Sequence, residues 1–360
     1  MTRAIGNTLK SQSGPVLITG HTGFKGVWLT ILLETLGVKV VGYSLPAKND
    51  SLFKMMNRQG KIEEKFADIT AFSQLQNFIS ITKPCAIIHL AAQALVLESY
   101  NQPLETFNTN VMGTANLLEA AFAVESVKVV AAITTDKVYQ NKNLGRKFCE
   151  TDPLEGKDPY SASKVGSEAA ISAWQQIQKL SGGPKVLSLR AGNVIGGGDL
   201  ATNRLIPDLV RAFQNRTCVT IRSPKSTRPW QHVLDPLIGY VIAVEKSFSE
   251  IKFESYNFGP TEKSLQVLDV VGIFKEEIGS GVEIVIEEVI EEVESKTLDL
   301  DSSRAIQHLG WLPLCEQTEA IAITFGWWDA VLVSGKDPEE VTKKDINEML
   351  TRLNLRKLDH

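Results

Sequence analysis

Short apolar runs alternate with helical patterns through the first half of the chain. Residues 16–19 (VLIT) precede a segment with helical spacing at 27–37, and residues 39–44 (KVVGYS) predict a second strand. The same rhythm continues in four segments, which are an expected helix at 71–81, a buried strand at 86–92, a long helix at 105–123 and a strand at 127–135. This alternation predicts an α/β fold with a doubly wound parallel (Rossmann) sheet, whose strand ends meet at one ligand-binding edge.

The composition is that of an ordinary globular protein. The 360 residues are 43% hydrophobic and 22% charged, which is enough chain for a substantial core in one large domain or two. The net charge of −4 gives no reason to expect a nucleic-acid or membrane partner, so a small polar substrate is favoured. Four scattered cysteines without a CxxC pair argue against a metal site and a disulfide framework. With no long apolar run and no signal-peptide pattern, we expect a cytoplasmic protein.

A glycine-rich turn follows the first expected strand. Gly20, Gly23 and Gly26 would let backbone amides, including those around Thr22 and Phe24, approach a pyrophosphate at a helix N-terminus. The spacing is GxxGxxG rather than GxGxxG, and a glycine triplet alone can be a plain turn. Its strand-turn-helix context favours dinucleotide binding.

The second expected strand ends without an acidic residue, in GYSLP, so the choice between NAD and NADP stays open at this position. Lys25 could meet a 2′-phosphate, but a solvated loop lysine is the favoured interpretation. Asp68, followed by Ile69 after a third short strand (EKFAD), could meet the adenine end or cap a turn, and the two readings are about even.

The 127–135 strand ends in TTDKVY, where Thr135 precedes an acid, Asp136, and a base, Lys137. Further on, YSASK places Tyr160 and Lys164 four residues apart, hence on one face of a helix. The ammonium could lower the pKa of the phenol and also hold a ribose hydroxyl. Both patterns have ordinary explanations, since YxxxK is common on helices and polar pairs are common in loops.

Taken together, the motifs resemble the extended short-chain dehydrogenase/reductase family from about Val16 to about Trp328. Within that family they are similar to the CDP-glucose 4,6-dehydratases, which carry Asp-Lys where dTDP-glucose dehydratases carry Asp-Glu. The motifs that carry the resemblance are TGHTGFKG, HLAAQ, NTNVMGTANLLEA, TTDKVY, DPYSASK, RAGNVIGGGD, RLIPDLVRAF, RPWQHV, YNFGP and LDSSRA.

The resemblance implies a set of site residues and NAD as the cofactor, with no metal. The implied catalytic residues are Thr135, Asp136, Lys137, Tyr160 and Lys164. The implied cofactor-binding residues are Gly20, Thr22, Gly23, Phe24, Gly26, Asp68, Ile69, Leu90, Ala91, Ala92 and Asn110, together with Tyr160 and Lys164. The implied contacts of the nucleotide sugar are Gln93, Asn193, Arg204, Arg228, His232 and Glu294.

The implied reaction takes a hydride from C4 of a nucleotide glucose, removes water across C5 and C6, and returns the hydride to C6. Lys137 would take the C5 proton and Asp136 would protonate the leaving C6 hydroxyl. Both groups must then be uncharged when they react. Because a mutual ion pair favours the charged forms, we expect the two side chains to point at different substrate atoms.

The chain is expected to form two domains. Residues 1–189 would bind NAD, with 233–263 returning to that domain, and residues 190–232 with 264–335 would form a smaller substrate domain. The remaining 336–360 is a polar tail with a helical pattern. The chain departs from the family pattern at Leu97, at 144–150 and at Leu200, which are all expected on loops that meet the substrate. A further departure, at Val138, is expected to affect only packing and to be harmless.

Alternative functions are a dehydratase or epimerase acting on another nucleotide sugar, or a catalytically silent NAD-binding module. The family usually dimerises through helices that here carry Asn110 and Tyr160, so a homodimer or a dimer of dimers is expected.

Overall fold

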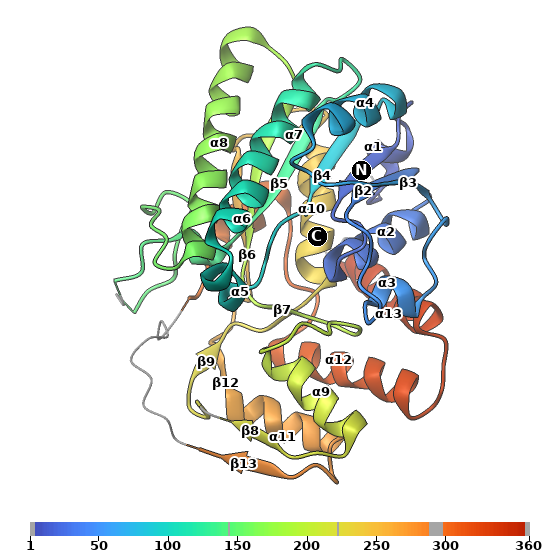
Figure 1. The fold of residues 1–360 in the computed structure, drawn as a ribbon, viewed down its shortest axis with the longest axis vertical. Helices are drawn as coiled ribbons and strands as arrows, with labels where there is room; N and C mark the ends of the chain where they lie inside the picture. The colour runs from blue at the N-terminus through green and yellow to red at the C-terminus, as the bar shows by residue number, and fades with distance from the viewer. Residues whose placement is uncertain (1–3, 143–144, 222, 288–297, 357–360) are drawn as a thin grey trace.

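A parallel sheet forms the centre of the molecule, whose computed structural model describes residues 4–142, 145–221, 223–287 and 298–356 (Figure 1). Its seven strands are β1 (Val16–Thr19), β2 (Val40–Ser44), β3 (Glu63–Phe66), β4 (Ala86–His89), β5 (Val129–Thr135), β6 (Lys185–Ala191) and β11 (Ser255–Phe258). They lie in the order β11-β6-β5-β4-β1-β2-β3, and each neighbouring pair is parallel. The predicted doubly wound sheet is therefore confirmed.

Strand β4 ends three residues earlier than predicted. The apolar run suggested a strand up to Ala92, whereas the extended segment stops at His89. The neighbouring strand β1 turns away at Gly20, whose φ is +75°, so its pairing with β4 ends at the hydrogen bond from the Leu90 amide to the Thr19 carbonyl. An apolar run shows that a segment is buried, but the neighbouring strand decides where pairing stops.

One face of the sheet is covered by helices from the first half of the chain. These are α4 (Phe72–Thr82), α5 (Val96–Asn101), α6 (Pro103–Phe107), α7 (Gly113–Phe122) and α8 (Pro159–Ser181). Between α6 and α7 the backbone forms a π-helical turn, η1 (Asn108–Met112), inside what was predicted as one long helix. Leu17, Val130 and Leu117 belong to the core on this face.

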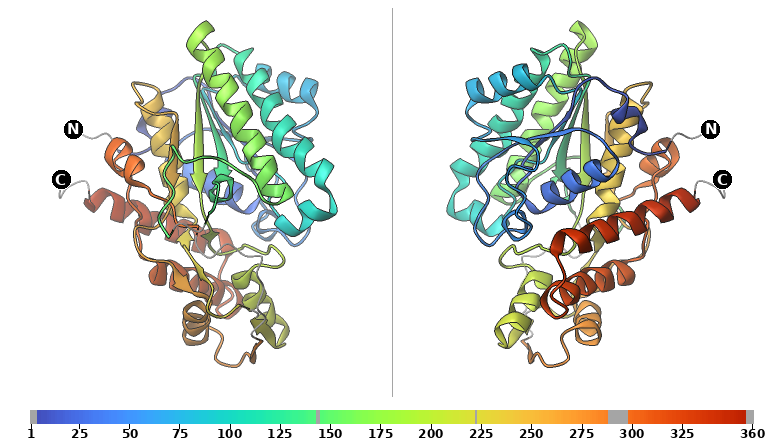
Figure 2. Two further views of the ribbon diagram at one scale, coloured as in Figure 1. Left: turned by 90° about the vertical axis from the view of Figure 1, so that its left-hand side faces the viewer. Right: turned by 90° about the vertical axis from the view of Figure 1, so that its right-hand side faces the viewer.

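The opposite face is covered by α2 (Phe24–Thr35), α10 (Leu234–Ser247) and α13 (Pro338–Arg356), with the short α1 (Asn7–Lys10) and α3 (Leu52–Met55) nearby. Val16 and Ile18 point into this second core while Leu17 points into the first, as the alternation along a strand requires. The views from either side show the sheet between its two helical layers (Figure 2).

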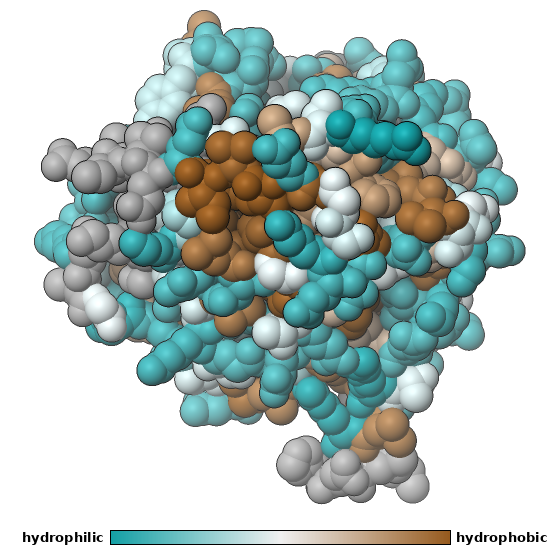
Figure 3. Space-filling model, turned by 90° about the horizontal axis from the view of Figure 1, so that it is seen from below, coloured by the Kyte–Doolittle hydropathy of each residue, from teal (hydrophilic) through white to brown (hydrophobic). Residues whose placement is uncertain are grey.

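Smaller elements from the second half form the lower end of the molecule in Figure 1. They are β7 (Val194–Ile195), α9 (Leu205–Asn215), β8 (Val219–Ile221), β9 (Thr227–Arg228), β10 (Gln231–His232), β12 (Leu265–Gln266), α11 (Val267–Glu277), β13 (Ile284–Ile286) and α12 (Gln317–Leu332). The π-helical turn η3 (Ala305–Leu309) instead packs against α10 and β11. Three two-stranded pairs link them, β10 with β7, β12 with β9 and β13 with β8. Seen from below, apolar surface alternates with hydrophilic surface at this end (Figure 3). None of the helices in the described ranges has the length and apolarity to cross a membrane.

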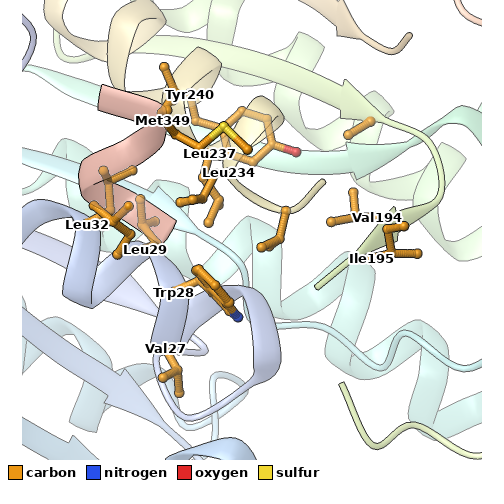
Figure 4. Close-up of a cluster of buried hydrophobic side chains, with 14 of the residues drawn as sticks. Val27, Trp28, Leu29, Leu32, Val194, Ile195, Leu234, Leu237, Tyr240 and Met349 are labelled. Atoms are coloured by element: carbon orange, nitrogen blue, oxygen red, sulfur yellow. The ribbon is translucent and has the colours of Figure 1, made fainter. Parts of the chain in front are cut away.

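The C-terminal helix α13 contributes to the main core. Met349 packs beside Leu29 and Leu32 of α2 and near Tyr240 of α10 (Figure 4). Thr342 accepts a hydrogen bond from the Trp327 indole at 3.0 Å. The segment that looked like a polar tail therefore carries a narrow buried stripe.

A buried carboxyl group joins α10 to the loop before α12. Asp235 is 1% exposed, and its Oδ1 accepts a hydrogen bond from the Leu314 amide at 2.6 Å. The Cys315 thiol lies 3.6 Å from Oδ2. Burial raises the pKa of Asp235 to about 7.

Substitution of Asp235 by asparagine is expected to stabilise the protein more at pH 8 than at pH 5. An unfolded aspartate ionises near about pH 4, so between about pH 4 and 7 the folded state holds the extra proton and wild-type stability falls as the pH rises. Asparagine mimics the protonated group, and at about 1.4 kcal/mol per pKa unit the gain above pH 7 is at most about 4 kcal/mol. Urea denaturation at both pH values measures this difference.

The exposed Asp50 supplies the control, because Asp50→Asn is expected to change stability equally little at both pH values. An equal loss of stability at pH 5 and pH 8 in Asp235→Asn would contradict the raised pKa of Asp235.

Candidate functional site

A glycine turn joins β1 to α2 at the carboxyl edge of the sheet. At Gly20 a Cβ would lie 2.7 Å from the Ala91 nitrogen, and at Gly26 it would lie 2.2 Å from the Gly20 oxygen. Gly23 is the N-cap of α2 and offers no side chain to the first backbone amides of the helix. Closely approachable backbone with free amides at a helix N-terminus fits a diphosphate, so the turn fits the pyrophosphate of a dinucleotide.

Two predicted cofactor residues make local hydrogen bonds beside this turn. The Thr22 hydroxyl lies 2.8 Å from the Ser44 hydroxyl at the end of β2 and donates to the Leu45 carbonyl. Asp68 Oδ1 accepts hydrogen bonds from the amide and the hydroxyl of Thr70, both at 2.7 Å. Asp68 therefore has the turn role that was one of its two predicted alternatives, while Ile69 beside it is buried.

Asn110, in the π-helical turn, fastens the loop after β4 to α8. Its Oδ1 accepts from the Gln93 amide at 2.8 Å, and its Nδ2 donates to the Gln93 carbonyl and to Ser163 Oγ. The loop held in this way contains Leu90, Ala91 and Ala92. π-helical turns are frequent at functional sites. This one directs the Asn110 side chain between the loop after β4 and helix α8.

His89, which the sequence analysis did not single out, links three elements beneath this loop. Its Nδ1 lies 2.7 Å from Thr19 Oγ1 and its Nε2 lies 3.2 Å from Thr114 Oγ1. Burial lowers the pKa of His89 to about 3, so the ring is neutral at physiological pH. Its role in the structure is to hold β1, β4 and α7 together.

The predicted acid and base stand at the end of β5, in the short 3₁₀ turn η2 (Asp136–Val138). Asp136 is 1% exposed, and its Oδ1 accepts from Thr135 Oγ1 at 2.9 Å and lies 3.5 Å from Lys137 Nζ. Its Oδ2 is buried and has no hydrogen-bond partner among the residues that the structure describes. The two side chains thus touch through Oδ1, while the prediction that they point at different substrate atoms stays a prediction. Oδ2 is left for another group.

Tyr160 and Lys164 lie on α8, which begins with a capping box between Asp158 and Ser161. Lys164 Nζ donates to the Ile133 carbonyl at 3.2 Å. Burial lowers the pKa of Lys164 to about 8, although the Glu168 carboxylate opposes this shift. Burial raises the pKa of Tyr160 to about 12, with a smaller lowering by the Thr135 hydroxyl. The expectation of a lowered phenol pKa is therefore wrong for the protein alone, because burial is the largest influence on this group.

Lys25 differs from its predicted place on a solvated loop. It belongs to the first turn of α2 and is only partly exposed. Burial lowers the pKa of Lys25 to about 8, and the charges of Arg204 and Lys164 act in the same direction while Asp136 and Asp199 oppose them. Lys25 is therefore within electrostatic reach of Lys164 and Asp136, two of the predicted site residues.

The predicted substrate contacts fall into different environments. Arg204 is the N-cap of α9 and lies 3.3 Å from Asp199, and Asn193 directly precedes β7. Arg228 is half-buried on β9. His232 is wholly buried against Trp28, with its Nδ1 accepting from the Leu234 amide, so we assign it no substrate contact. Glu294 lies outside the described residues.

A buried ion pair behind the site was missed by the sequence analysis. Arg190 on β6 donates to both oxygens of Glu168 at 2.8 Å, and Thr134 donates to Glu168 Oε1 at 2.6 Å. Burial acts to raise the pKa of Glu168, but the hydrogen bonds and charge of Arg190 outweigh it and the pKa is lowered. Glu168 lies four residues after Lys164 and therefore on the same face of α8. This spacing was the sequence feature that could have drawn attention to Glu168.

Residues 16–259 match the NAD dependent epimerase/dehydratase family. The chain is 40% identical over 349 residues to the CDP-glucose 4,6-dehydratase of Salmonella typhimurium, and the match covers 94% of this chain and 97% of that protein.

Two solved structures have the same fold. The UDP-glucose 4-epimerase of Thermotoga maritima, solved with UDP-glucose, has a TM-score of 0.77 over 88% of this chain and 99% of its own. A dTDP-glucose 4,6-dehydratase of Streptomyces venezuelae, solved with NAD, has a TM-score of 0.75 over 90% and 99%. Both are 23% identical to this chain, so they bear on the fold rather than on the substrate.

Proposed function

The chain belongs to the NAD-dependent epimerase/dehydratase family, and from this premise we propose that it converts CDP-glucose to CDP-4-keto-6-deoxyglucose with loss of one water. The observation that carries the proposal is the 40% identity, over nearly the whole length of both chains, to a CDP-glucose 4,6-dehydratase. Relatives that act on dTDP-glucose or epimerise UDP-glucose are only 25–29% identical.

The first step is proton removal from the C4 hydroxyl, for which Tyr160 is the base. A phenol with a raised pKa is a strong base once ionised. Because Lys164 lies one turn further along α8, its ammonium would favour the ionised form of the phenol. NAD would be held by the turn of Gly20, Gly23 and Gly26, and when bound it would supply the hydride-transfer chemistry of the reaction. Thr135 is placed beside the phenol to donate to the new carbonyl oxygen.

The second step needs a neutral base at C5 and a protonated acid at C6. The 3.5 Å contact between Lys137 Nζ and Asp136 Oδ1 offers a route, because one proton moved from the ammonium to the carboxylate leaves both groups in the required form. Exclusion of water by substrate favours that neutral pair. Lys137 then accepts the C5 proton, Asp136 gives its proton to the leaving C6 hydroxyl, and the ion pair is restored.

The proton transfer from Lys137 to Asp136 also affects the hydrogen bond between Thr135 and Asp136. In the structure Thr135 donates its only hydroxyl hydrogen to Asp136 Oδ1. Once Asp136 is protonated, Oδ1 is a weaker acceptor, and the Thr135 hydrogen can turn to the C4 oxygen of the substrate. The groups that serve the oxidation and the elimination therefore share one hydrogen-bonded unit.

The nucleotide diphosphate is expected to meet the small elements at the lower end of the molecule, which we assign to a substrate domain of residues 190–232 and 264–335. Arg204 and Arg228 are suited to phosphate oxygens, since a guanidinium group can bind them bidentately. Asn193 and Gln93 are the proposed polar neighbours of the sugar.

We also propose that the protein forms a homodimer whose interface consists of α5, α6 and α8. This dimer would be the basic unit of any larger assembly. Large apolar side chains are exposed on this side, among them Leu97 at 57%, Tyr100 at 58% and Leu104 at 83%. A surface of this kind usually marks an interface. Light scattering of the purified protein is expected to give at least twice the chain mass, and a monomer at micromolar concentration would contradict the dimer.

Mass spectrometry in deuterated water tests the reaction. We expect the purified protein with NAD to remove one water from CDP-glucose and to leave one solvent deuteron at C5, while the UDP, GDP and dTDP sugars react slowly or not at all. Preferred dehydration of another sugar would overturn the proposed nucleotide and keep the mechanism. No dehydration of any of the four would contradict the proposed function.

A further inference from the structure

Asp136 has one occupied and one unoccupied carboxylate oxygen. Oδ1 is held by Thr135 at 2.9 Å and approached by Lys137 at 3.5 Å. Oδ2 is buried without a partner among the described residues, and a buried acceptor left unpaired costs free energy unless a ligand satisfies it. The atom is therefore prepared for a group that arrives with the substrate.

Gly192 lies directly opposite this oxygen. Thr135 and Ala191 are paired in register on β5 and β6, so the residues that follow them, Asp136 and Gly192, face each other at the edge of the sheet. A Cβ added to Gly192 would lie 3.1 Å from Asp136 Oδ2 and 3.8 Å from Pro229 Cγ. The space in front of Oδ2 thus exists because residue 192 has no side chain.

Backbone conformation does not explain this glycine. Gly192 is not among the glycines with positive φ, so an L-residue could adopt its conformation without strain. A side chain would instead push against a carboxylate that cannot turn away without losing its bond to Thr135. What the missing side chain provides is room beside Asp136.

We propose that Gly192 is a specificity-determining position, where the absence of a side chain leaves room for the primary C6 hydroxyl of the hexose against Asp136 Oδ2. This inference rests on the proposed dehydration. In that reaction the hydroxyl at this place accepts the Asp136 proton as the C6–O bond breaks and leaves as water. A side chain at residue 192 meets Asp136 and Pro229 first and displaces the hydroxyl from the acid, whereas Thr135 and Tyr160 are not among its nearest neighbours.

The test compares Gly192→Ala and Gly192→Val on two substrates. With CDP-glucose, water loss followed by mass spectrometry is expected to fall about 10²-fold for alanine and further for valine, since small misplacements of reacting groups cost this much. With CDP-6-deoxyglucose, which lacks the C6 hydroxyl, oxidation at C4 transfers a hydride to NAD and a proton to Tyr160. NADH formation from this substrate, followed at 340 nm, is expected to stay within about twofold of wild type, which also shows that the variants fold.

Gly272→Ala is the matched control, because Gly272 lies on α11 and a Cβ at this position would have nothing within 4 Å. It is expected to leave both rates unchanged. Undiminished water loss in Gly192→Val, or an equal loss of both activities in Gly192→Ala, would overturn the inference. If the wild-type protein does not dehydrate CDP-glucose at all, the proposed function itself fails. That result concerns the wild type, so it differs from the two variant results that would overturn the inference about Gly192.

Discussion

Replacement of Lys137 by alanine is expected to stop exchange of the C5 hydrogen with solvent while NAD binding stays intact. The variant keeps Thr135, Tyr160 and Lys164, so C4 can still be oxidised, but no other group in the described part of the chain is assigned as the base for C5. Loss of a positioned base typically costs about 10²–10⁴ in rate. We therefore expect NADH to accumulate with CDP-glucose, at 340 nm, while mass spectrometry detects almost no deuterium at C5.

The matched control for this variant is Lys128→Ala. Lys128 precedes the opposite end of the same strand, is exposed, and donates to the nearby Glu125 carbonyl. It should leave exchange and turnover unchanged. Exchange at an undiminished rate in Lys137→Ala would remove Lys137 from the mechanism.

Removal of the buried carboxylate in Glu168→Gln is expected to cost about 3–5 kcal/mol of unfolding free energy, because the Arg190 charge is left uncompensated in the core. Both side chains are almost completely buried and share two hydrogen bonds of 2.8 Å. This loss is a large part of the stability of an ordinary domain. The midpoint of urea denaturation measures it.

Two further variants separate the buried charge from other effects of the substitution. Lys179→Ala breaks an exposed pair with Glu254, and such pairs contribute about 0–1 kcal/mol. The double variant Glu168→Gln with Arg190→Met removes both charges and is expected to recover part of the stability lost in the single variant. Equal losses in Glu168→Gln and Lys179→Ala would show that the buried pair is not the cause.

The strand that precedes the proposed catalytic residues could be predicted closely. The run VKVVAAITT predicted a strand ending at Thr135, and β5 ends there. Seven consecutive buried residues bounded by polar ones form a local signal that needs no knowledge of neighbours. Asp136 and Lys137 follow from that end point, so their place at the sheet edge could be inferred before any coordinates.

Features that depend on distant neighbours could not be predicted. The long helix through Asn110 was expected to be regular, and the π-helical turn that aims this side chain at Gln93 and Ser163 leaves no local pattern. Arg190 was taken as the first residue of a substrate domain, and only the fold brings it to Glu168. The same holds for Lys25, whose surroundings come from α2, α8 and the loop before α9.

The docking of α13 bears on the order in which the chain can fold during synthesis. Helix α2 leaves the ribosome long before α13, and its Leu29 and Leu32 face a place that Met349 fills only after all the intervening elements have been made (Figure 4). Domains tend to fold as units while translation proceeds, and apolar surface exposed in the meantime invites aggregation. We therefore expect the apolar surface of α2 to stay exposed in the nascent chain until α13 emerges to cover it.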